Sequence, residues 1–337
     1  MSFQNVVANK PVVDQSVLSS LEKQTLVNYP EPRLSPTHPP KASKVEALRV
    51  LDLNKSFRSG FLRRAIRGVE GVSFTVNKGE VFALLGHNGA GKTTTINCIL
   101  DLVHPDGGEI NIFGCPTDKI QSRARVGYLP ERPYFFEHLT GRELLAFYAQ
   151  LLDVSSADQK IQIPEILEKT GMSADANRPL RKYSKGMLQR IGLAQALIGD
   201  PDLLILDEPM SGLDPIGRRE VRHLLQELKA QGKTIILSSH IVPDVEVLAD
   251  SVGIMCEGRL AVTCSMSELT NQSSYDIRIL DEKSILGYSV LVAADVGALR
   301  QTLEKCALEN QKVMNVETRR SGLEDLFMQV HAERTEA

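Results

Sequence analysis

Short apolar runs alternate with longer stretches of helical periodicity along most of the chain from residue 48 onward. Four runs are most distinct: VFALL at 81–85, LLIL at 203–206, TIIL at 234–237 and VGIM at 252–255. Runs of this length with polar or glycine neighbours are typical of strands that are buried on both faces of a parallel sheet. The alternation of such strands with helices predicts an α/β fold.

A helix is predicted directly after Ser184. Its apolar positions recur at helical spacing, at Leu188, Ile191, Ala194 and Leu197. The Gly-Asp-Pro sequence at 199–201 then supplies good helix terminators. The pattern therefore predicts a helix with one apolar side that ends just before the run at 203–206.

The chain changes character near residue 268. Three segments there have strand character: 275–280, 288–293 and 312–318. Between the second and third of these segments a helix is expected, with its inward positions at Val296, Leu299, Leu303 and Ala307. A final helix is expected to point Leu323, Leu326, Phe327 and Val330 inward. We predict a small α+β domain over 266–337. About seventy residues make a small core, so we expect this domain to lean on the larger one or on a second copy of itself.

The first 45 residues differ from the rest. They hold six of the sixteen prolines, and the stretch YPEPRLSPTHPPKAS at 29–43 has neither a helical nor a strand period. We interpret residues 1–45 as a flexible, proline-rich extension. The main domain is then expected over 46–265.

Composition excludes several classes of protein. The 337 residues carry 39 Lys and Arg against 42 Asp and Glu, a net charge of −3, so general attraction to nucleic acid is not expected. The longest apolar runs are far shorter than the roughly 18 residues of a membrane span. The N-terminus also lacks the basic start and apolar core of a secretory signal. We therefore expect a protein of the cytosol.

Five cysteines are present: Cys98, Cys115, Cys256, Cys264 and Cys306. Their number is odd and they form no C-x-x-C pair, which argues against both a disulfide framework and a zinc site. The sequence therefore predicts small buried thiols in a reducing compartment.

The sequence GHNGAGKT at 86–93 fits the phosphate-binding pattern G-x-x-x-x-G-K-S/T. It follows the predicted strand at 81–85 and precedes an apolar helical sequence, which is the context that the pattern requires. Its glycines let successive N–H groups point at a phosphate, Lys92 would reach the β and γ phosphates, and the Thr93 hydroxyl would bind Mg²⁺. The predicted nucleotide-binding residues here are Gly86, His87, Asn88, Gly89, Ala90, Gly91, Lys92, Thr93 and Thr94.

Two adjacent carboxylates follow the run at 203–206. Ligands of open α/β sheets bind at the carboxyl ends of the strands, so Asp207 and Glu208 are expected beside the phosphate loop. Asp207 would hold Mg²⁺, in our interpretation through water. Glu208 would accept a proton from the water that attacks the γ phosphate.

Together these residues resemble the ATP-binding cassette (ABC) ATPases, from about Leu48 to Cys264. The sequence YSKGM at 183–187 is similar to the family signature L-S-G-G-Q and precedes the acidic strand, as in the family. The resemblance implies a P-loop NTPase cassette with a RecA-like core and a helical subdomain, using ATP and Mg²⁺. It also implies a second cassette, in our prediction a second copy, whose Ser184 and Gly186 face the first cassette's phosphate loop.

Further residues match the family in order. The sequence SGLD at 211–214 resembles the D-loop and assigns Asp214 to the nucleotide site. His240 resembles the switch histidine that contacts the γ phosphate, so Lys92, Glu208 and His240 are the predicted catalytic residues. Phe57 resembles the aromatic residue that stacks on adenine.

Three features depart from the family pattern. Lys185 and Met187 replace a glycine and the glutamine of the signature. Glu131 stands where the family has glutamine, which places another carboxylate near Mg²⁺ and the attacking water. A basic loop, with Arg58, Arg63, Arg64 and Arg67, is either solvated or in contact with lipid headgroups or a membrane subunit.

Four features together resemble ATP-binding subunits of ABC-2 type exporters: GYLPE at 127–131, EHLTGRELLAFYA at 137–149, the YSKGM signature and SGLEDLFMQV at 321–330. The resemblance implies a separate integral-membrane permease and a location at the inner face of the cell membrane. Phe135, Phe136 and Leu139 are then candidate permease contacts, or ordinary core residues. An alternative is a soluble ABC ATPase that acts on ribosomes or nucleic acid; the single cassette and the acidic charge argue against it. The C-terminal domain could also be a regulatory module. The sequence does not identify the transported cargo, because in this family the permease selects it.

Overall fold

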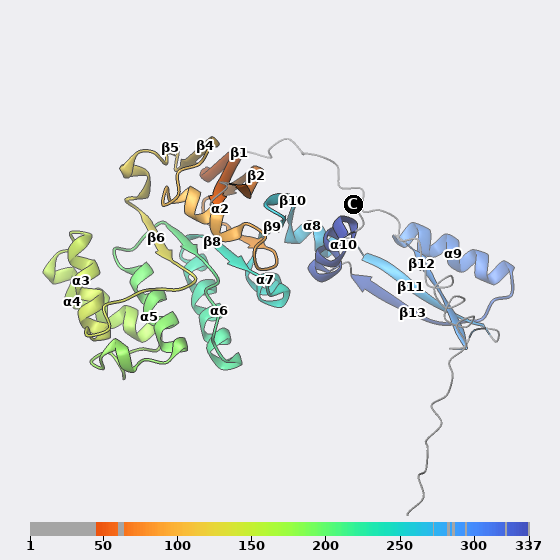
Figure 1. Ribbon diagram of the computed structural model, residues 1–337. Helices are drawn as coiled ribbons and strands as arrows, with labels where there is room; N and C mark the ends of the chain where they lie inside the picture. The colour runs from red at the N-terminus through yellow and green to blue at the C-terminus, as the bar shows by residue number, and fades with distance from the viewer. Residues whose placement is uncertain are drawn as a thin grey trace, which may run out of the picture. The chain divides into compact units, whose positions relative to one another are not determined.

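Figure 1 shows a computed structural model of the chain, which describes residues 45–59, 64–271, 273–281, 284, 287–293, 295–320 and 322–335. These residues form two units. The larger contains the described residues up to Ser273 and those from Arg320 onward, and the smaller spans Ser274–Arg319. The predicted extension, apart from Val45, lies outside the described residues.

A six-stranded sheet forms the centre of the larger unit. In sheet order its strands are β10 (Arg259–Ser265), β9 (Ser251–Cys256), β3 (Val81–Leu85), β8 (Thr234–Ser239), β7 (Leu203–Leu206) and β6 (Val126–Leu129). All neighbours pair in parallel except β10, which runs antiparallel to β9. The four apolar runs are therefore confirmed as strands of one largely parallel sheet.

Strand β3 shows why these runs contain so few polar residues. Successive side chains of a strand point to opposite faces. Val81, Ala83 and Leu85 belong to one buried cluster, which also contains helical residues, and Phe82 and Leu84 belong to another. Both faces of the sheet are covered, so every position of the strand is apolar.

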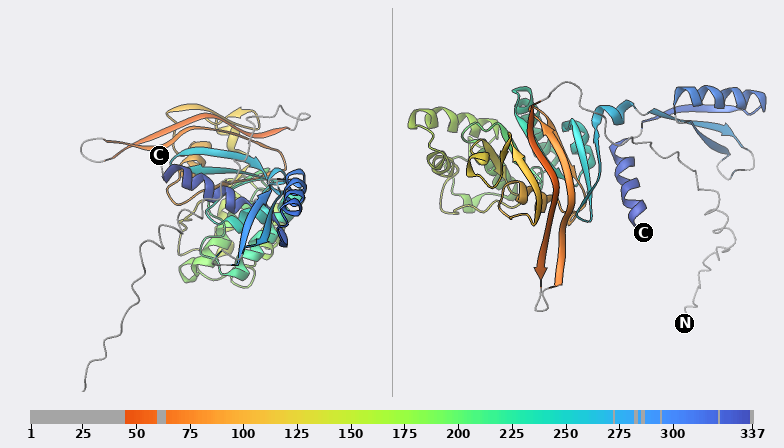
Figure 2. Two further views of the ribbon diagram at one scale, coloured as in Figure 1. Left: turned by 90° about the vertical axis from the view of Figure 1, so that its right-hand side faces the viewer. Right: turned by 90° about the horizontal axis from the view of Figure 1, so that it is seen from above.

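The second of these clusters lies between the six-stranded sheet and an antiparallel four-stranded sheet. The latter has the order β2 (Arg64–Asn77), β1 (Glu46–Ser59), β4 (Gly107–Ile112) and β5 (Cys115–Pro116). Its two longest strands form the extended ribbon in Figure 2. The Phe74 and Phe82 rings, one from each sheet, stack with centroids 4.8 Å apart. Helix α2 (Lys92–Ile99) packs into the same core through Ile96 and Ile99.

The buried cluster on the other face of the six-stranded sheet contains residues from α3 (Gly141–Leu151), α4 (Ser156–Lys169), α5 (Lys185–Leu197), α6 (Pro215–Ala230) and α7 (Val242–Leu248). Helix α8 (Met266–Asn271) follows β10, and η1 (Ile120–Arg123) and η2 (Leu180–Lys182) are short turns. Helices α3, α4 and α5 pack on one another as a helical subdomain. Ser184 caps α5, so the helix predicted there is confirmed. Among the described helices, none has both the length and the apolar character of a membrane span.

The smaller unit is a three-stranded sheet with one helix. The strands have the order β12 (Tyr288–Ala293), β11 (Ser273–Leu280) and β13 (Val313–Arg320), and the helix is α9 (Val296–Leu308). The three predicted strands and the helix are confirmed. The inward face predicted for α9 is wrong at its ends: Val296 is 66% exposed and Ala307 is exposed, whereas Cys306 is buried.

The last helix, α10 (Leu323–Thr335), packs on the larger unit. Leu323, Leu326 and Val330 are buried in the cluster that also contains residues of α3 to α7, beside α7 and β9. The Leu323 N–H also donates to Glu246 Oε1 of α7 at 3.1 Å. This differs from the single accessory domain predicted over 266–337, because α10 belongs to the larger unit. An apolar stripe in the sequence predicts that one side of a helix is buried, but it does not predict against which core the helix packs.

Candidate functional site

The loop at 86–93 connects β3 to α2, as its sequence predicts. Gly91 precedes α2 with φ of 103°, and no described side chain caps the first turn of the helix. A Cβ atom on Gly86 would lie 2.6 Å from the Met255 carbonyl oxygen. Both positions therefore require glycine. The loop and the uncapped helix start present backbone N–H groups and a positive dipole end, which suit a phosphate.

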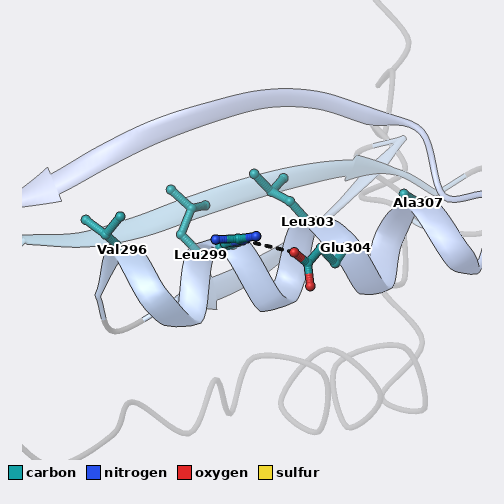
Figure 3. A pocket seen from close by; sticks show the side chains of 6 residues that line it. Val296, Leu299, Leu303, Glu304 and Ala307 are labelled. Carbon is teal, nitrogen blue, oxygen red and sulfur yellow. Dashed lines mark hydrogen bonds and ion pairs between the residues drawn. The ribbon is translucent and has the colours of Figure 1, made fainter.

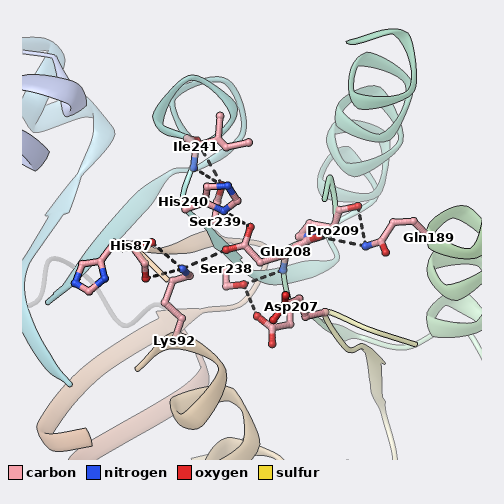
Figure 4. A network of polar contacts seen from close by, with 12 residues as sticks. His87, Lys92, Gln189, Asp207, Glu208, Pro209, Ser238, Ser239, His240 and Ile241 are labelled. Atoms are coloured by element: carbon pink, nitrogen blue, oxygen red, sulfur yellow. Dashed lines mark hydrogen bonds and ion pairs between the residues drawn. The ribbon is translucent and has the colours of Figure 1, made fainter. Parts of the chain in front are cut away.

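Lys92, the first residue of α2, is buried in the middle of this loop. Its Nζ donates to Gly86 O at 2.7 Å and to His87 O at 3.3 Å. It also lies 3.2 Å from Glu208 Oε1. Figure 4 shows these contacts converging on one ammonium group. The structure thus brings together the lysine of the loop and a carboxylate at the end of β7, which are far apart in the sequence.

Glu208 lies between the side chains of Lys92 and His240. Its Oε2 is 2.9 Å from His240 Nδ1, opposite the contact with Lys92. An ionised carboxylate only accepts hydrogen bonds, so Nδ1 carries the proton of this pair. Glu208 adopts φ of 50°, in the left-handed region that residues other than glycine rarely adopt. Such strain persists where surrounding bonds enforce it, and it is common at functional sites.

Two side chains that the sequence analysis does not single out hold this strained position. The Glu208 N–H donates to Ser238 Oγ at 2.8 Å. The Gln189 side chain, buried on α5, donates to the carbonyl oxygens of Glu208 and Pro209, each at 3.2 Å. The available signals were weak: a serine inside an apolar strand, and a glutamine on the buried side of a helix. Figure 4 shows both residues beside the end of β7.

Asp207 is fully buried. Ser238 Oγ donates to its Oδ1 at 2.5 Å, and its Oδ2 has no hydrogen-bond partner among the described residues. Burial raises the pKa of this carboxyl group. Hydrogen bonding to Ser238 and Thr93 opposes the shift, and the negative charges of Glu208 and Glu131 add to it.

These features fit a bound Mg²⁺. A buried carboxylate oxygen without a hydrogen-bond partner is the hard oxygen donor that Mg²⁺ prefers, and a cation would offset the desolvation of the charge. Thr93 and Glu131 act on Asp207 closely enough to change its pKa. Both are exposed, and Glu131 Oε1 lies 3.9 Å from Arg132 Nε.

Phe57 lies at the edge of the same region. Phe57 is 39% exposed as a residue, and its ring covers Gly68 on the neighbouring strand, where a Cβ atom would lie 2.7 Å from the ring. A Cβ atom on Gly91 would in turn lie 3.1 Å from the Gly68 carbonyl oxygen. The Phe57 ring and the phosphate loop therefore both pack closely against Gly68. The exposed part of the ring offers a surface on which a planar group can stack.

The remaining predicted residues have roles within their own elements. Ser184 Oγ accepts the Met187 N–H at 3.2 Å at the start of α5. Asp214 Oδ1 accepts the Gly217 N–H at 2.8 Å at the start of α6. Binding of nucleotide by Ser184, Gly186 and Asp214 stays a prediction. The side chains of the basic loop, Arg58 to Arg67, lie outside the described residues.

Comparisons with known proteins agree with this geometry. The family model described as ABC transporter matches residues 69–211. An ABC transporter ATP-binding protein of Synechocystis sp. is 37% identical over 84% of this chain and 84% of its own. The fluoroquinolones export ATP-binding protein of Mycobacterium tuberculosis is 34% identical over 85% of this chain and 93% of its own.

A solved structure of an ATP-binding subunit of an ABC transporter is also similar to this chain. It shares 33% identity and a TM-score of 0.59, and the match covers 66% of this chain and 91% of that one. The match therefore extends over nearly all of the solved subunit. The fold, the phosphate loop and the sequence relatives agree, and the chain belongs to the family of ABC transporter ATP-binding proteins.

Proposed function

We propose that this chain is the ATP-binding and ATP-hydrolysing subunit of a transporter whose permease is a separate membrane protein, of the ABC-2 exporter type. The observation that carries the proposal is the placement of Glu208 between Lys92 and His240, at 3.2 and 2.9 Å. This placement supports Glu208 as the general base of ATP hydrolysis. The relative named for fluoroquinolone export supports the exporter assignment.

The substrate ATP would bind along the phosphate loop, with its adenine on Phe57 and its phosphates on Lys92 and the N–H groups at the start of α2. Thr93 and Asp207 would hold Mg²⁺, with Glu131 nearby. When bound, Mg²⁺ neutralises phosphate charge and orients the γ phosphate. The protein's part is to keep these groups in place before the substrate arrives.

Glu208 would take the proton of the attacking water. His240 fixes one of its carboxylate oxygens, and the bonds from Ser238 and Gln189 fix its backbone. The carboxylate is therefore already oriented before the reaction, and little entropy is lost in orienting it. General-base catalysis of this kind contributes about 10²–10⁴-fold to a rate.

Transport would use ATP-driven closure of two cassettes, which in our proposal are two copies of this chain. Ser184 and Gly186 of one copy would cover the ATP held by the phosphate loop of the other. Hydrolysis removes the bridging γ phosphate, so the copies separate. A permease attached to both would alternate its access, and the chain would lie at the inner face of the cell membrane.

The surface for the permease would be an aromatic patch before and on α3. Tyr134, Phe136 and Phe147 are 89, 53 and 37% exposed. The Phe136 and Phe147 rings meet edge to face with centroids 5.8 Å apart. Phe135 and Leu139, two of the three contacts predicted from sequence, pack instead against the core. Exposed aromatic clusters of this kind are suited to protein partners.

Purification of the tagged chain from detergent-solubilised membranes tests the transporter assignment. A multi-span membrane protein is expected to co-purify, and Phe136→Ser is expected to reduce its recovery. Leu102→Ser is a matched control, because Leu102 is 62% exposed on a different segment. Sedimentation with ribosomes and no membrane partner would contradict the proposal and favour the non-transport alternative.

A further inference from the structure

Three side chains from separate segments of the larger unit meet beside the phosphate loop. His87 belongs to the loop, Cys256 ends β9 and His331 lies on α10. One ring nitrogen of each histidine and the cysteine Sγ all lie within 4.8 Å of one another. The sequence spacing argued against a zinc site, but spacing rules detect only ligands that are close in the chain, and these three are brought together by the fold.

Hydrogen bonds fix the tautomer of both histidines. His87 Nδ1 lies 2.7 Å from the Asn88 carbonyl oxygen, and His331 Nδ1 lies 2.9 Å from the Phe327 carbonyl oxygen. A carbonyl only accepts, so Nδ1 of each ring donates, and Nε2 is the nitrogen that a neutral imidazole has left to bind a metal. Metal-binding histidines commonly show this arrangement, in which the second nitrogen donates to a backbone carbonyl.

Aromatic packing restrains the rings further. The His87 and His331 rings meet edge to face with centroids 5.4 Å apart. The Phe327 ring packs against His331 with centroids 4.3 Å apart. The cysteine is buried and His87 is exposed, so the cluster has a closed side and a side open to solvent. Such a site can admit an ion and leave a position for water.

We propose that His87, Cys256 and His331 bind one divalent ion of the zinc class. Two imidazoles and one thiolate select such ions over Mg²⁺, which prefers oxygen. Bond lengths of about 2.0–2.3 Å place the ligand atoms of a zinc site roughly 3.3–3.8 Å apart. The separations between the ligand atoms, which reach up to 4.8 Å, must therefore shrink by up to roughly 1.0–1.5 Å when an ion binds.

The ion would connect the nucleotide site to the C-terminal helix. The His87 carbonyl accepts from Lys92 at 3.3 Å, and the same residue's ring would bind the ion. Leu326 and Val330 anchor α10 in the core of the larger unit. Metal bonds would thus tie the phosphate loop to α10. Because metal binding needs no nucleotide, it can be tested separately from the proposed ATPase activity.

Titration of the nucleotide-free, full-length protein with Co²⁺ and then Zn²⁺ tests the proposal. Co²⁺ is expected to produce a thiolate charge-transfer band with one equivalent bound, and Zn²⁺ is expected to displace it. Cys256→Ser is expected to remove the band. His331→Gln is expected to weaken Zn²⁺ binding by about 100-fold or more, since even loss of an outer-shell partner costs 10–100-fold.

Two variants serve as matched controls. Cys264→Ser removes another buried thiol, one whose pKa burial raises to about 11, so that it stays protonated. His223→Gln removes an exposed histidine of α6, which pairs with Glu227 at 3.1 Å. Both are expected to bind Co²⁺ and Zn²⁺ like the unaltered protein. Absence of the band at saturating Co²⁺, a full band in Cys256→Ser, or unchanged Zn²⁺ affinity in His331→Gln would overturn the proposal.

Discussion

The end of β7 and the small C-terminal unit hold their residues in place by very different means. Leu206, Asp207 and Glu208 follow one another where buried clusters cover both faces of a sheet. Glu208 is further fixed by Ser238, Gln189, Lys92 and His240. In the small unit only four residues form the described buried core: Ile277, Ile279, Ala293 and Cys306.

The small unit also leaves apolar surface on its helix. Figure 3 shows Val296, Leu299, Leu303 and Ala307 in a row along α9. They line an open hollow of about 420 Å³, beside the ion pair between Arg300 and Glu304 at 3.0 Å. The comparison shows that a sheet buried on both faces can hold side chains in the positions that a reaction requires. A small unit with one thin core can form a defined fold, but its free energy of unfolding is expected to be small.

Truncation of one buried aliphatic residue in each region is the strongest way to break this comparison. Leu206 and Ile277 are both fully buried. Leu206→Ala is expected to lower the free energy of unfolding of the larger unit by about 2–5 kcal/mol and to impair ATP turnover, because Asp207 and Glu208 follow it directly. Ile277→Ala is expected to destabilise the small unit, with turnover largely kept.

Thermal unfolding, followed by calorimetry together with ATPase assays, measures both effects. The unaltered protein is expected to show separate transitions for the two units, and each variant should shift one of them. Equal shifts of all transitions in both variants would show that the two units unfold as one.

A smaller effect is expected from the serine that supports both carboxylates. Ser238→Ala removes the bonds to Asp207 Oδ1 and to the Glu208 N–H. Leaving a buried polar group unsatisfied costs about 1–3 kcal/mol. If the two carboxylates lose the same amount of transition-state stabilisation, ATP turnover falls by roughly 5- to 150-fold. Steady-state phosphate release at saturating Mg²⁺ and ATP measures it.

The next residue along β8 provides the control for this substitution. Ser239 is also buried, but its hydroxyl bonds with the backbone of Ile241. Ser239→Ala is expected to retain most of the turnover. Equal losses in the two variants would mean that the strand as a whole matters, rather than the bonds to Asp207 and Glu208.

The smallest effect is expected at an exposed contact of the larger unit. Lys55 Nζ donates to Asp106 at 2.7 Å, and the Ser56 N–H and hydroxyl donate to it at 2.7 and 2.8 Å. These groups, Lys55 first, hold the pKa of Asp106 well below its usual range. A lowered pKa in the folded state adds stability above the unfolded pKa of about 3.9, and this stability is lost as pH falls.

Asp106→Asn is therefore expected to be slightly less stable than the unaltered protein at pH 7. Urea unfolding should show the difference shrink as pH falls below about 4. It should also shrink at high salt, because exposed charges are screened. A difference that stays constant with pH would assign it to lost hydrogen bonds rather than to the charge of Asp106.

The sequence alone predicted the parts of the site that continuous burial enforces. The runs that became β3, β7, β8 and β9 are apolar because both faces of the sheet are covered. The carboxyl ends of parallel strands meet at one edge, so placing Asp207 and Glu208 beside Lys92 required no knowledge of side-chain contacts.

Contacts that depend on the mutual placement of distant elements could not be predicted in this way. A polar residue on a buried face, such as Gln189 or Ser238, signals a partner but not which one. The apolar stripe of α10 signals a buried side but not that it joins the cassette core. The meeting of His87, Cys256 and His331 depends on that same packing, and no spacing along the chain reveals it.

The central claim is that Glu208, held by Lys92 and His240, performs chemistry rather than binding. Glu208→Gln tests it most directly, with ATP affinity and ATP turnover measured on the same preparation and Lys92→Ala for comparison. The account predicts near-normal ATP affinity with turnover reduced by at least about 100-fold in Glu208→Gln, and weakened ATP binding in Lys92→Ala. Near-normal turnover in purified Glu208→Gln would contradict it.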